Sequence, residues 1–417
     1  MKYSQSFINT LRSNPKDETS VNAKLLLRGG FIDKLMAGSY TFLPLGWRVY
    51  QKIEEIVRQE MNAIGGGEVL MPLLHPKDVW NETGRWGDKG VKEIMYQFKS
   101  VDNREYGLSF THEEIFLDVV RKHSLSYKNL PVKLYHFSTK FRNEPRAKSG
   151  LLRGREFIMK DLYSLHSAEE DLDNFYWQVA GAYLKIFKRL GLEKVKTVEA
   201  SGGVFTSGHT HEFQVIHPVG EDTIYHCHKC DWAHNKEIHV HKIGSKCPEC
   251  GGEIETASSI EIGNIFRFGT VYSEKMGVNF KNADGQLKPA YLGSYGIGMS
   301  RLLGVLAEIF NDDFGLVWPV AIAPFKIHLV SLGGTAAKAE KVYQQIIAES
   351  AEVLWDDRDE SPGVKLSDAD LIGAPYRIII SDKTLGKESL EIKKRGDNKT
   401  DLIKISELGS WLKKISP

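Results

Sequence analysis

The chain has 417 residues, a formal net charge of +1 at pH 7 and an apolar fraction of 41%. Chains of this length form about two or three domains more often than a single one. The apolar fraction is sufficient for a sizeable core. No apolar run approaches the roughly 18–20 residues that cross a bilayer, and residues 1–20 lack the apolar stretch of a secretory signal. We therefore expect a cytoplasmic protein rather than a membrane or secreted one.

An amphipathic helix is predicted over residues 46–64, where apolar side chains recur at steps of three and four residues. Three glycines at residues 65–67 end this helix. Residues 68–76 are predicted to form a buried strand that breaks at proline. Two further strands and a long helix follow, over residues 132–138, 155–164 and 168–191.

The segment between these two strands is basic, since residues 139–157 carry six Lys or Arg against two Glu. Arg142 and Glu144 alternate along a strand and so point to the same face, and Arg153 returns on the next strand. An antiparallel pair of this kind presents guanidinium groups to phosphate in forked, charge-assisted hydrogen bonds. Phe157 offers an aromatic face to a base. A solvated basic surface is the alternative interpretation.

All four cysteines lie in two C-x2-C pairs with 16 residues between the pairs. This is the spacing of a zinc ribbon, in which four thiolates surround one tetrahedral ion. The predicted ligands are Cys227, Cys230, Cys247 and Cys250. Such a site is closed, so the zinc would hold the fold rather than activate water. A disulfide or idle thiols are the alternatives, and a disulfide is disfavoured in a cytoplasmic protein.

Five histidines accompany the cysteines, and for them a solvated polar face is the preferred interpretation, with a second metal site as the alternative. They are His226, His228, His234, His239 and His241.

Residues 286–307 pass from a strand into a helix at the sequence GSYGIGMSR. Gly296 and Gly298 remove side chains at this turn and would let a ligand approach the backbone, and Arg301 follows one turn into the helix. The segment is similar to the dinucleotide-binding pattern G-x-G-x-x-G. However, Arg301 takes the place of the last glycine and no β-α-β unit begins here, so the pattern is a weak signal by itself.

Strands alternate with helices over about 90 residues from residue 323 onward, ending in a helix over residues 401–415. This alternation predicts a small α/β domain with a mixed sheet. Residues 383–399 carry six Lys or Arg against three acidic residues and are a second candidate for a nucleic-acid surface. A solvated face is again the alternative.

Several of these segments together resemble a known family. FRNEP at residues 141–145 and YGIGMSR at residues 295–301 are similar to the paired signatures of class II aminoacyl-tRNA synthetases. Nearly the whole chain resembles prolyl-tRNA synthetases of the bacterial type, including SFTHEE, LRGREFIMKDLYS, HEFQV, IEIGNIFRFGTVYSE and VWPVAIAPF. The resemblance implies that L-proline and ATP give prolyl-adenylate and pyrophosphate, and that the prolyl group then passes to tRNA(Pro).

The resemblance also implies roles for the basic segment and the glycine-rich turn. Arg142 would bind the α-phosphate and stabilise the charge that develops there, without a covalent enzyme intermediate. Glu144 would hold the adenine amino group or a positioning water, and Phe157 and Arg301 would stack on the two faces of adenine. Arg153 and Arg301 would hold the γ-phosphate, while Mg²⁺ bridges the phosphates. The other implied ATP-binding residues are Gly296 and Gly298.

For proline, Thr111 and Glu113 match the family's T-x-E, which takes the ammonium, with Glu113 as the counter-charge. His211 matches a histidine that lines the ring pocket, and Arg142 and Met159 complete the implied proline site. From the residues alone, Thr111 and Glu113 would be the N-cap and a first-turn carboxylate of the following helix. By the same standard, His211 would be an ordinary core histidine.

The implied fold class is α/β: an α+β catalytic domain with the antiparallel sheet of class II synthetases, a small α/β anticodon-binding domain and a zinc-ribbon insertion. The predicted parts are the catalytic domain (residues 1–220 and 258–322), the ribbon (221–257) and the anticodon-binding domain (323–417). Arg358, Lys393 and Arg395 would face the anticodon. The 46–64 helix and Pro72 match the family's dimer interface, so a homodimer is expected.

The chain departs from the family mildly at Thr210, Asn264 and Ser294, and strongly at the cysteines. In many bacterial relatives the two cysteine pairs flank an editing domain that hydrolyses alanyl-tRNA(Pro). Sixteen residues are too few for a catalytic domain. We therefore expect that this chain does not clear alanyl-tRNA(Pro) itself, and that either a separate deacylase does so or the cell tolerates the error.

Three other functions are considered. A class II synthetase for threonine, serine or glycine is disfavoured by THEE and HEF, because those pockets need different contacts. A zinc-ribbon nucleic-acid adaptor leaves most of the chain unexplained. A catalytically inactive paralogue that binds tRNA or regulates is disfavoured because the signature residues are retained, namely Arg142, Glu144, Arg153 and Arg301.

Overall fold

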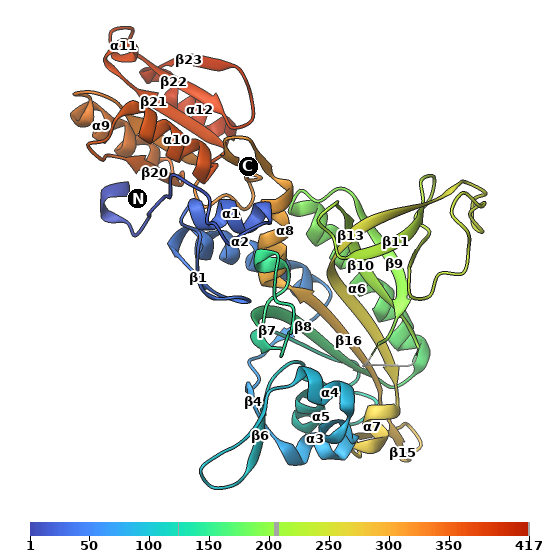
Figure 1. Cartoon of the computed structure of the whole chain (residues 1–417). Coiled ribbons are helices and arrows are strands. Elements are labelled where there is room, and N and C mark those ends of the chain that lie inside the picture. The colour runs from blue at the N-terminus through green and yellow to red at the C-terminus, as the bar shows by residue number, and fades with distance from the viewer. Residues whose placement is uncertain (124, 204–207, 416–417) are drawn as a thin grey trace. The chain divides into compact units, whose positions relative to one another are not determined.

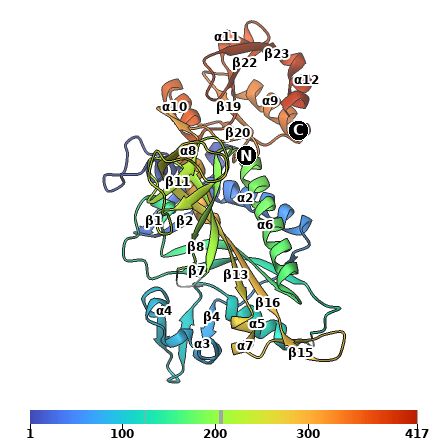
Figure 2. The same ribbon diagram turned by 90° about the vertical axis from the view of Figure 1, so that its right-hand side faces the viewer.

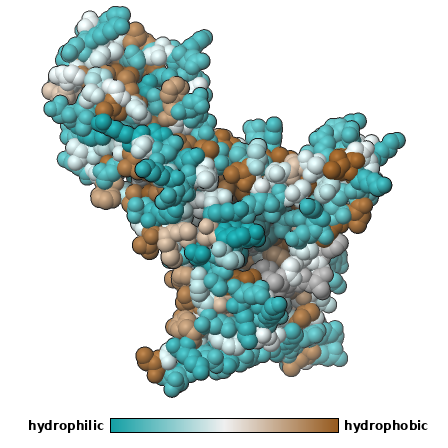
Figure 3. Space-filling model, in the orientation of Figure 1, coloured by the Kyte–Doolittle hydropathy of each residue, from teal (hydrophilic) through white to brown (hydrophobic). Residues whose placement is uncertain are grey.

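The computed structural model describes residues 1–123, 125–203 and 208–415, and the chain forms two compact units (Figure 1). We name residues 54–148 and 152–302 the sheet unit, and residues 1–53, 149–151 and 303–417 the terminal unit. Among the described helices, none is long and apolar enough to cross a membrane. On the face shown in Figure 3, hydrophilic residues predominate and hydrophobic residues form small groups.

A nine-stranded sheet forms the centre of the sheet unit, with its strands hydrogen-bonded in the order β10-β9-β12-β11-β13-β16-β8-β7-β3. The neighbouring strands β13, β16, β8 and β7 pair antiparallel, which confirms the predicted antiparallel sheet. The bounds are β3 (Gly67–Glu68), β7 (Val132–Phe141), β8 (Glu156–His166), β9 (Val195–Ser201), β10 (His209–Ile216), β11 (Asp222–Cys227), β12 (Ala233–Asn235), β13 (Ile254–Gly269) and β16 (Tyr291–Gly298). The predicted ribbon segment thus contributes β11, β12 and the start of β13 to this sheet. The predicted domain boundaries themselves stay a prediction.

Helix α6 (Glu169–Arg189) covers one face of this sheet (Figure 2) and confirms the long helix predicted over residues 168–191. Acidic residues occupy its first turn and basic residues its last turn, which complements the helix dipole. Successive side chains of a strand point to opposite faces, so Lys160 of β8 reaches Tyr183 of α6 while Met159 and Asp161 point away from it. The face to which Met159 and Asp161 point, opposite α6, carries the candidate site.

A small sheet in the order β4-β6-β5 packs with short helices around a core that includes Trp80, Trp86 and Phe110. Strand β6 leads through residues 109–112 into helix α5, so this small sheet positions the start of α5. We name residues 111–113 the T-H-E turn. The bounds are β4 (Leu74–Pro76), β5 (Gln97–Lys99), β6 (Glu105–Leu108), α3 (Lys77–Thr83), α4 (Lys89–Ile94) and α5 (Glu113–Arg121). The unit is completed by α7 (Val271–Lys275), β14 (Asn279–Lys281) and β15 (Leu287–Pro289).

The predicted buried strand over residues 68–76 is wrong. The segment contains only the last residue of β3 and the three residues of β4, and Leu70 between them is 82% exposed. Pro72 has no backbone N–H for a ladder hydrogen bond, so the chain leaves one sheet and enters the other at this point.

The terminal unit contains a mixed five-stranded sheet in the order β20-β19-β21-β22-β23, which confirms the α/β domain predicted after residue 323. Its bounds are β19 (Ile327–Ser331), β20 (Val353–Asp356), β21 (Tyr376–Ile380), β22 (Ser389–Lys394), β23 (Thr400–Lys404), α9 (Ala336–Ala348), α10 (Pro362–Ile372), α11 (Asp382–Leu385) and α12 (Leu408–Ile415). The closing helix was predicted too long, because residues 400–404 pair with β22 as an edge strand.

The N-terminal residues are part of the same unit. The α-amino group of Met1 donates to the carbonyl of Val353 at 2.8 Å, and Lys2 forms a parallel bridge with Trp355. The other elements here are α1 (Val21–Arg28), β1 (Ile32–Met36), β2 (Ser39–Phe42), β17 (Asn311–Asp312) and β18 (Gly315–Leu316). Helices α2 (Pro44–Ala63) and α8 (Met299–Ile309) each contain residues of both units, and α2 confirms the helix predicted over residues 46–64.

Candidate active site

Three of the predicted site residues meet on the face of the sheet opposite α6. Arg142 directly follows β7, and its guanidinium carbon lies 5.2 Å from the ring centre of Phe157 on β8. Its Nη2 lies 4.0 Å from Sδ of Met159, two residues further along β8. The backbone N–H of Arg142 donates to the carbonyl of Arg155 at 2.8 Å, so the antiparallel pairing continues past the end of β7 and holds this cation in place.

The charge of Arg142 has no carboxylate partner among the described residues, and its Nε is buried without a hydrogen-bond partner. Burial and the nearby positive charge of Arg301 both lower the pKa of Arg142. A cation placed in this way is costly unless an anion compensates it. The geometry therefore suits the binding of an anionic group such as phosphate.

Arg301 lies in the first turn of α8 and is held by three hydrogen bonds. Its Nη1 donates to the carboxylate of Glu261 at 2.9 Å and to the carbonyl of Glu261 at 2.8 Å, and its Nε donates to the carbonyl of Leu152 at 2.9 Å. A Cβ on Gly298 would lie 3.2 Å from Cβ of Arg301, and a Cβ on Gly296 would lie 2.6 Å from Cε of Met159. The two glycines therefore make room for two other predicted site residues.

Glu144 and Arg153 pair with each other across the basic loop at 2.8 Å. Arg153 also pairs with Glu221 at 2.8 Å, and Glu144 accepts from the backbone N–H of Arg146 at 2.9 Å. Although burial opposes it, these hydrogen bonds lower the pKa of Glu144, so the carboxylate is ionised at neutral pH.

The T-H-E turn presents a buried carboxylate. Oε2 of Glu113 accepts from Oγ1 of Thr111 at 2.6 Å, and Oε1 accepts from Oγ of Ser294 at 3.1 Å. Glu113 does lie in the first turn of α5, but His112 occupies the N-cap position and the hydroxyl of Thr111 donates to a carboxylate. The interpretation of Thr111 as an N-cap is therefore wrong.

Arg85, which lies 28 residues before Glu113 in the chain, was not among the predicted site residues. Its Nη1 donates to the carboxylate of Glu114 at 3.0 and 3.1 Å and to that of Glu113 at 3.4 Å. Thr83 adds a hydrogen bond to Glu114 at 2.9 Å, and burial raises the pKa of Glu114. No local pattern in a helical turn reveals such a long-range contact.

His211 lies on the other face of the sheet. It pairs with Ile265 in β13, which pairs with Tyr295 in β16, and Tyr295 in turn pairs with Leu162 on the α6 side of β8. The hydroxyl of Tyr176 in α6 lies 2.7 Å from Nδ1 of His211. The alternation of side chains thus places His211 against α6 and away from Met159.

Next to His211, the acidic residue Glu212 does point to the site face, where it pairs with Asn264 in the register of β10 and β13. Gln214 donates to Glu212 at 2.9 Å and to Asp222 at 3.1 Å. Burial and the negative charge of Glu261 raise the pKa of Glu212 to about 8, and the same two causes raise the pKa of Asp222. The segments HEFQV and IEIGN were part of the family resemblance, but Glu212, Asp222 and Glu261 were not predicted as site residues.

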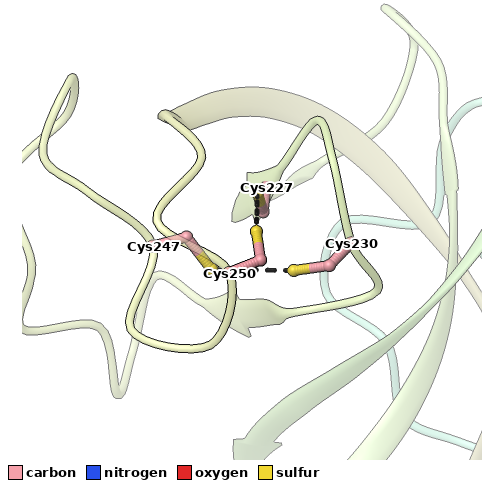
Figure 4. Close-up of side chains that lie close together, drawn as sticks. All are labelled: Cys227, Cys230, Cys247 and Cys250. Atoms are coloured by element: carbon pink, nitrogen blue, oxygen red, sulfur yellow. Dashed lines mark hydrogen bonds between the residues drawn. The ribbon is translucent and has the colours of Figure 1, made fainter.

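The four cysteines converge (Figure 4), with their sulfur atoms all within 4.8 Å of one another. Sγ of Cys227 lies 3.4 Å from that of Cys250, and Sγ of Cys230 lies 3.6 Å from that of Cys247. Zinc–sulfur bonds of about 2.3 Å in a tetrahedron place sulfurs roughly 3.8 Å apart, so the set fits zinc. Backbone N–H groups of Lys229 and Gly252 point to the sulfurs at 3.3 and 3.4 Å, and the four thiols are free.

The histidines of this stretch do not form a second candidate metal group among the described residues. Three of them surround the ring of Trp232, at centroid distances of 4.5, 6.0 and 5.7 Å for His234, His239 and His241. His239 also stacks on Tyr225 at 3.5 Å. These three rings therefore pack against aromatic residues and do not form the solvated face that we expected.

Two of the residues predicted to face the anticodon are engaged within the terminal unit. Arg358 pairs with Asp356 at 2.7 Å and with Asp368 at 2.8 Å, and its guanidinium lies 3.6 Å from the ring centre of Tyr3. Arg395 is held by Asp312 at 2.6 Å. Lys393 lies half-buried on β22.

Comparison with known families gives two matches. Residues 96–310 match the tRNA synthetase class II core domain (G, H, P, S and T), and residues 319–415 match the anticodon binding domain. Over 98% of both chains the sequence is 38% identical to a proline--tRNA ligase of a Wolbachia species. It is 37% identical to that of Agrobacterium fabrum, over 97% of this chain and 98% of the relative. It is 32% identical to that of Halothermothrix orenii, over 100% and 99%.

A solved structure has a similar fold. The prolyl-tRNA synthetase from Cryptosporidium parvum, complexed with L-proline and AMP, superposes with a TM-score of 0.77 at 18% identity, over 97% of this chain and 77% of the other.

Proposed function

Because the chain belongs to the proline--tRNA ligases, which are class II aminoacyl-tRNA synthetases, we propose that it joins L-proline to tRNA(Pro) by way of prolyl-adenylate. The observation that carries this proposal is the position of Arg142. It is a cation without a carboxylate partner among the described residues, and it lies beside Phe157 and Met159. The carboxylate of Glu113 is held at the T-H-E turn of the same unit.

In the first step, the carboxylate of proline attacks the α-phosphorus of ATP and pyrophosphate leaves. Arg142 binds the α-phosphate and stabilises the negative charge that develops on its oxygens, while Phe157 stacks on adenine. Glu113, oriented by Thr111 and Ser294, takes the ammonium of proline, and Met159 contacts the ring. In the second step, the terminal hydroxyl of tRNA(Pro) attacks the carbonyl of prolyl-adenylate and AMP leaves.

Glu144, Arg153 and Arg301 complete the ATP site in this proposal, with Glu144 at adenine and the two arginines at the γ-phosphate. Mg²⁺ supplies charge neutralisation between the phosphates when it is bound. The carboxylates of Glu212, Asp222 and Glu261 are hard oxygen donors of the kind that Mg²⁺ prefers. Burial and the negative charge of Glu261 raise the pKa of Glu212, and a cation would relieve the repulsion between these carboxylates.

Amino-acid-dependent ATP–pyrophosphate exchange tests this function. With each of the twenty amino acids at equal enzyme concentration, we expect strong exchange with proline and weaker exchange with alanine and cysteine, because they fill the same pocket less completely. Exchange with threonine, serine or glycine in place of proline would point to another synthetase. An enzyme preparation that is folded and yet exchanges with no amino acid would instead favour the inactive, tRNA-binding paralogue.

We also propose that the protein does not edit alanyl-tRNA(Pro). The alignment with the Halothermothrix orenii relative extends over 566 positions, whereas the one with the Agrobacterium fabrum relative needs only 437. Relatives of the longer kind thus carry a long stretch that this chain lacks. A ring pocket rejects a smaller amino acid by only about 1–3 kcal/mol for each missing methylene, so mischarging with alanine is expected.

The editing proposal has a direct test. Purified enzyme mixed with preformed alanyl-tRNA(Pro) should leave the ester to decay at the rate found in buffer alone. The matched control is prolyl-tRNA(Pro) under the same conditions. Hydrolysis of the alanyl ester well above the buffer rate would contradict the proposal; its absence would leave clearance to a separate deacylase or to tolerance of the error.

Three further features belong to this proposal. One structural zinc is bound by Cys227, Cys230, Cys247 and Cys250. The protein is a cytoplasmic homodimer whose interface includes the segment around Pro72, where Leu70 and Leu74 are exposed. Residues 319–415 bind the anticodon, and Lys393 forms no ion pair among the described residues that would compete with RNA.

A further inference from the structure

Lys140 on β7 is a fully buried lysine whose three N–H groups are all used. Its Nζ lies 2.5 Å from a carboxylate oxygen of Asp161, 2.6 Å from Oγ of Ser138 and 2.8 Å from Nδ1 of His112. The side chain is 0% exposed. Lysine is almost never buried to this extent unless it is paired, so this site requires an explanation.

The surroundings of the ammonium are those of a metal site. The donor atoms of His112, His136 and Asp161 lie within 4.8 Å of one another. Nζ of Lys140 lies close to all three, since it is also 3.4 Å from Nε2 of His136. The charge that a metal ion would supply to such a group is thus supplied by a side chain of the protein.

His112 connects this cluster to the candidate site, because it is the middle residue of the T-H-E turn. An ammonium group can only donate, so Nδ1 of His112 accepts and its Nε2 carries the proton. Nε2 then donates to the carbonyl of Pro72 at 3.0 Å. The backbone N–H of His112 donates to the hydroxyl of Tyr163 at 2.9 Å, and this hydroxyl donates to Asp161 at 3.2 Å. Both the side chain and the backbone of His112 are therefore tied to the Lys140–Asp161 pair.

We propose that Lys140 is a positioning residue for the amino acid: through His112 it orients the T-H-E turn, so that Thr111 and Glu113 face the substrate ammonium. The proposal rests on the function given above, because it assigns the ammonium to Glu113. Lys140 itself is buried below the turn and does not touch the substrate.

The charges around the cluster support this role. Asp161 is the anion, Lys140 is the cation, and Arg142 and Glu113 face the pair from the site side. His75, His136 and Tyr163 complete the surroundings. Burial and the charge of Lys140 lower the pKa of His112 well below its ordinary value, so the imidazole is neutral at physiological pH and accepts a hydrogen bond from the ammonium of Lys140.

Lys160 provides a matched control, since it is a second lysine with 0% exposure, on the neighbouring strand β8. Its Nζ donates to the hydroxyl of Tyr183 and to the carbonyl of Tyr295 at 3.0 Å, on the α6 side of the sheet. Lys160→Met therefore removes a buried lysine without touching the T-H-E turn.

The experiment measures KM for proline and for ATP in pyrophosphate exchange. For Lys140→Met we expect KM for proline to rise roughly 10- to 100-fold, the factor for losing one charge-assisted hydrogen bond, with a much smaller change in KM for ATP. For Lys160→Met we expect KM for proline to stay within about twofold of the wild type, because its ammonium donates to Tyr183 and Tyr295 on the α6 side of the sheet rather than to the T-H-E turn. If Lys140→Met does not fold, the double variant Lys140→Met/Asp161→Asn removes both charges and should show the same rise.

A pH profile separates positioning from mere packing. Without Lys140, the anion of Asp161 is left beside His136 and His112, and a protonated imidazole compensates it. This imidazolium loses its proton as pH rises, so KM for proline in Lys140→Met should increase from about pH 6 to 8. KM for proline of the wild type should not change over this range.

Two results would overturn the proposal: an equal rise of KM for proline in Lys140→Met and Lys160→Met, or no rise in either. A pH profile of Lys140→Met parallel to that of the wild type would also overturn it. Absence of proline-dependent exchange in the wild type would instead refute the proposed function, so the two failures are distinguishable.

Discussion

Replacing Arg142 by alanine is expected to lower proline-dependent ATP–pyrophosphate exchange by roughly 100- to 1,000-fold, the usual cost of removing one preorganised donor from a developing oxyanion. The guanidinium lies against Phe157 and Met159, and no carboxylate pairs with it in the described part of the chain. It is therefore available to the α-phosphate without first breaking an ion pair. The loss should appear mainly in kcat, because the interaction strengthens as charge develops.

The design of this test includes two further variants. Arg142→Lys retains the charge but not the fork of donors, and should recover only part of the rate. Arg104→Ala removes an arginine whose side chain is 77% exposed in the loop between β5 and β6, and should leave exchange unchanged. Near-normal exchange by Arg142→Ala would show that another group binds the α-phosphate.

Removing zinc should have the second large effect. We expect about one zinc per chain in untagged protein, and its loss in Cys247→Ser, because a closed four-thiolate site does not tolerate the loss of a ligand. Structural zinc contributes on the order of 10 kcal/mol to folding in small peptides. The small cluster of Cys227, Trp232, Cys247 and Ile254 cannot replace that contribution. Residues 221–257 should consequently become sensitive to limited proteolysis in the variant or after chelation.

The control for the zinc test is His228→Ala, a neighbour of Cys227 whose side chain is 42% exposed. This variant should keep its metal and its resistance to protease. That result would show that the thiolates, and not His228, bind the metal. Less than about 0.2 equivalents of zinc in folded wild-type protein would contradict the assignment.

Contacts between residues close in the chain were accessible from the sequence. The cysteine pairs lie within 24 residues, and knuckle turns leave their thiolates few alternatives, so the spacing predicted a cluster that the structure contains. The meeting of Arg142 with Phe157 follows from one antiparallel pair of strands joined by one loop. In both cases local geometry decides which side chains meet.

Predictions that depended on register across several strands were less successful. His211 and Glu212 are neighbours in the chain, and a shift of one residue exchanges which of them faces the site. That choice is set by the pairing of β10 with β13, which includes a bulge, and periodicity along one strand does not reveal it. The sequence therefore identified the segment HEFQV but not the residue in it that faces the site.

The sequence by itself determined the family, the mixed α/β fold class and the cysteine cluster, because these depend on motif identity, local periodicity and short-range spacing. Only the tertiary structure decided how the charges are neutralised. It engages Arg358 and Arg395 with aspartates, brings Arg85 to Glu113 and Glu114, and places Lys140 beneath His112. Burial makes an unpaired charge costly, so these charged side chains take the partners that the packed fold brings near, however distant in the chain.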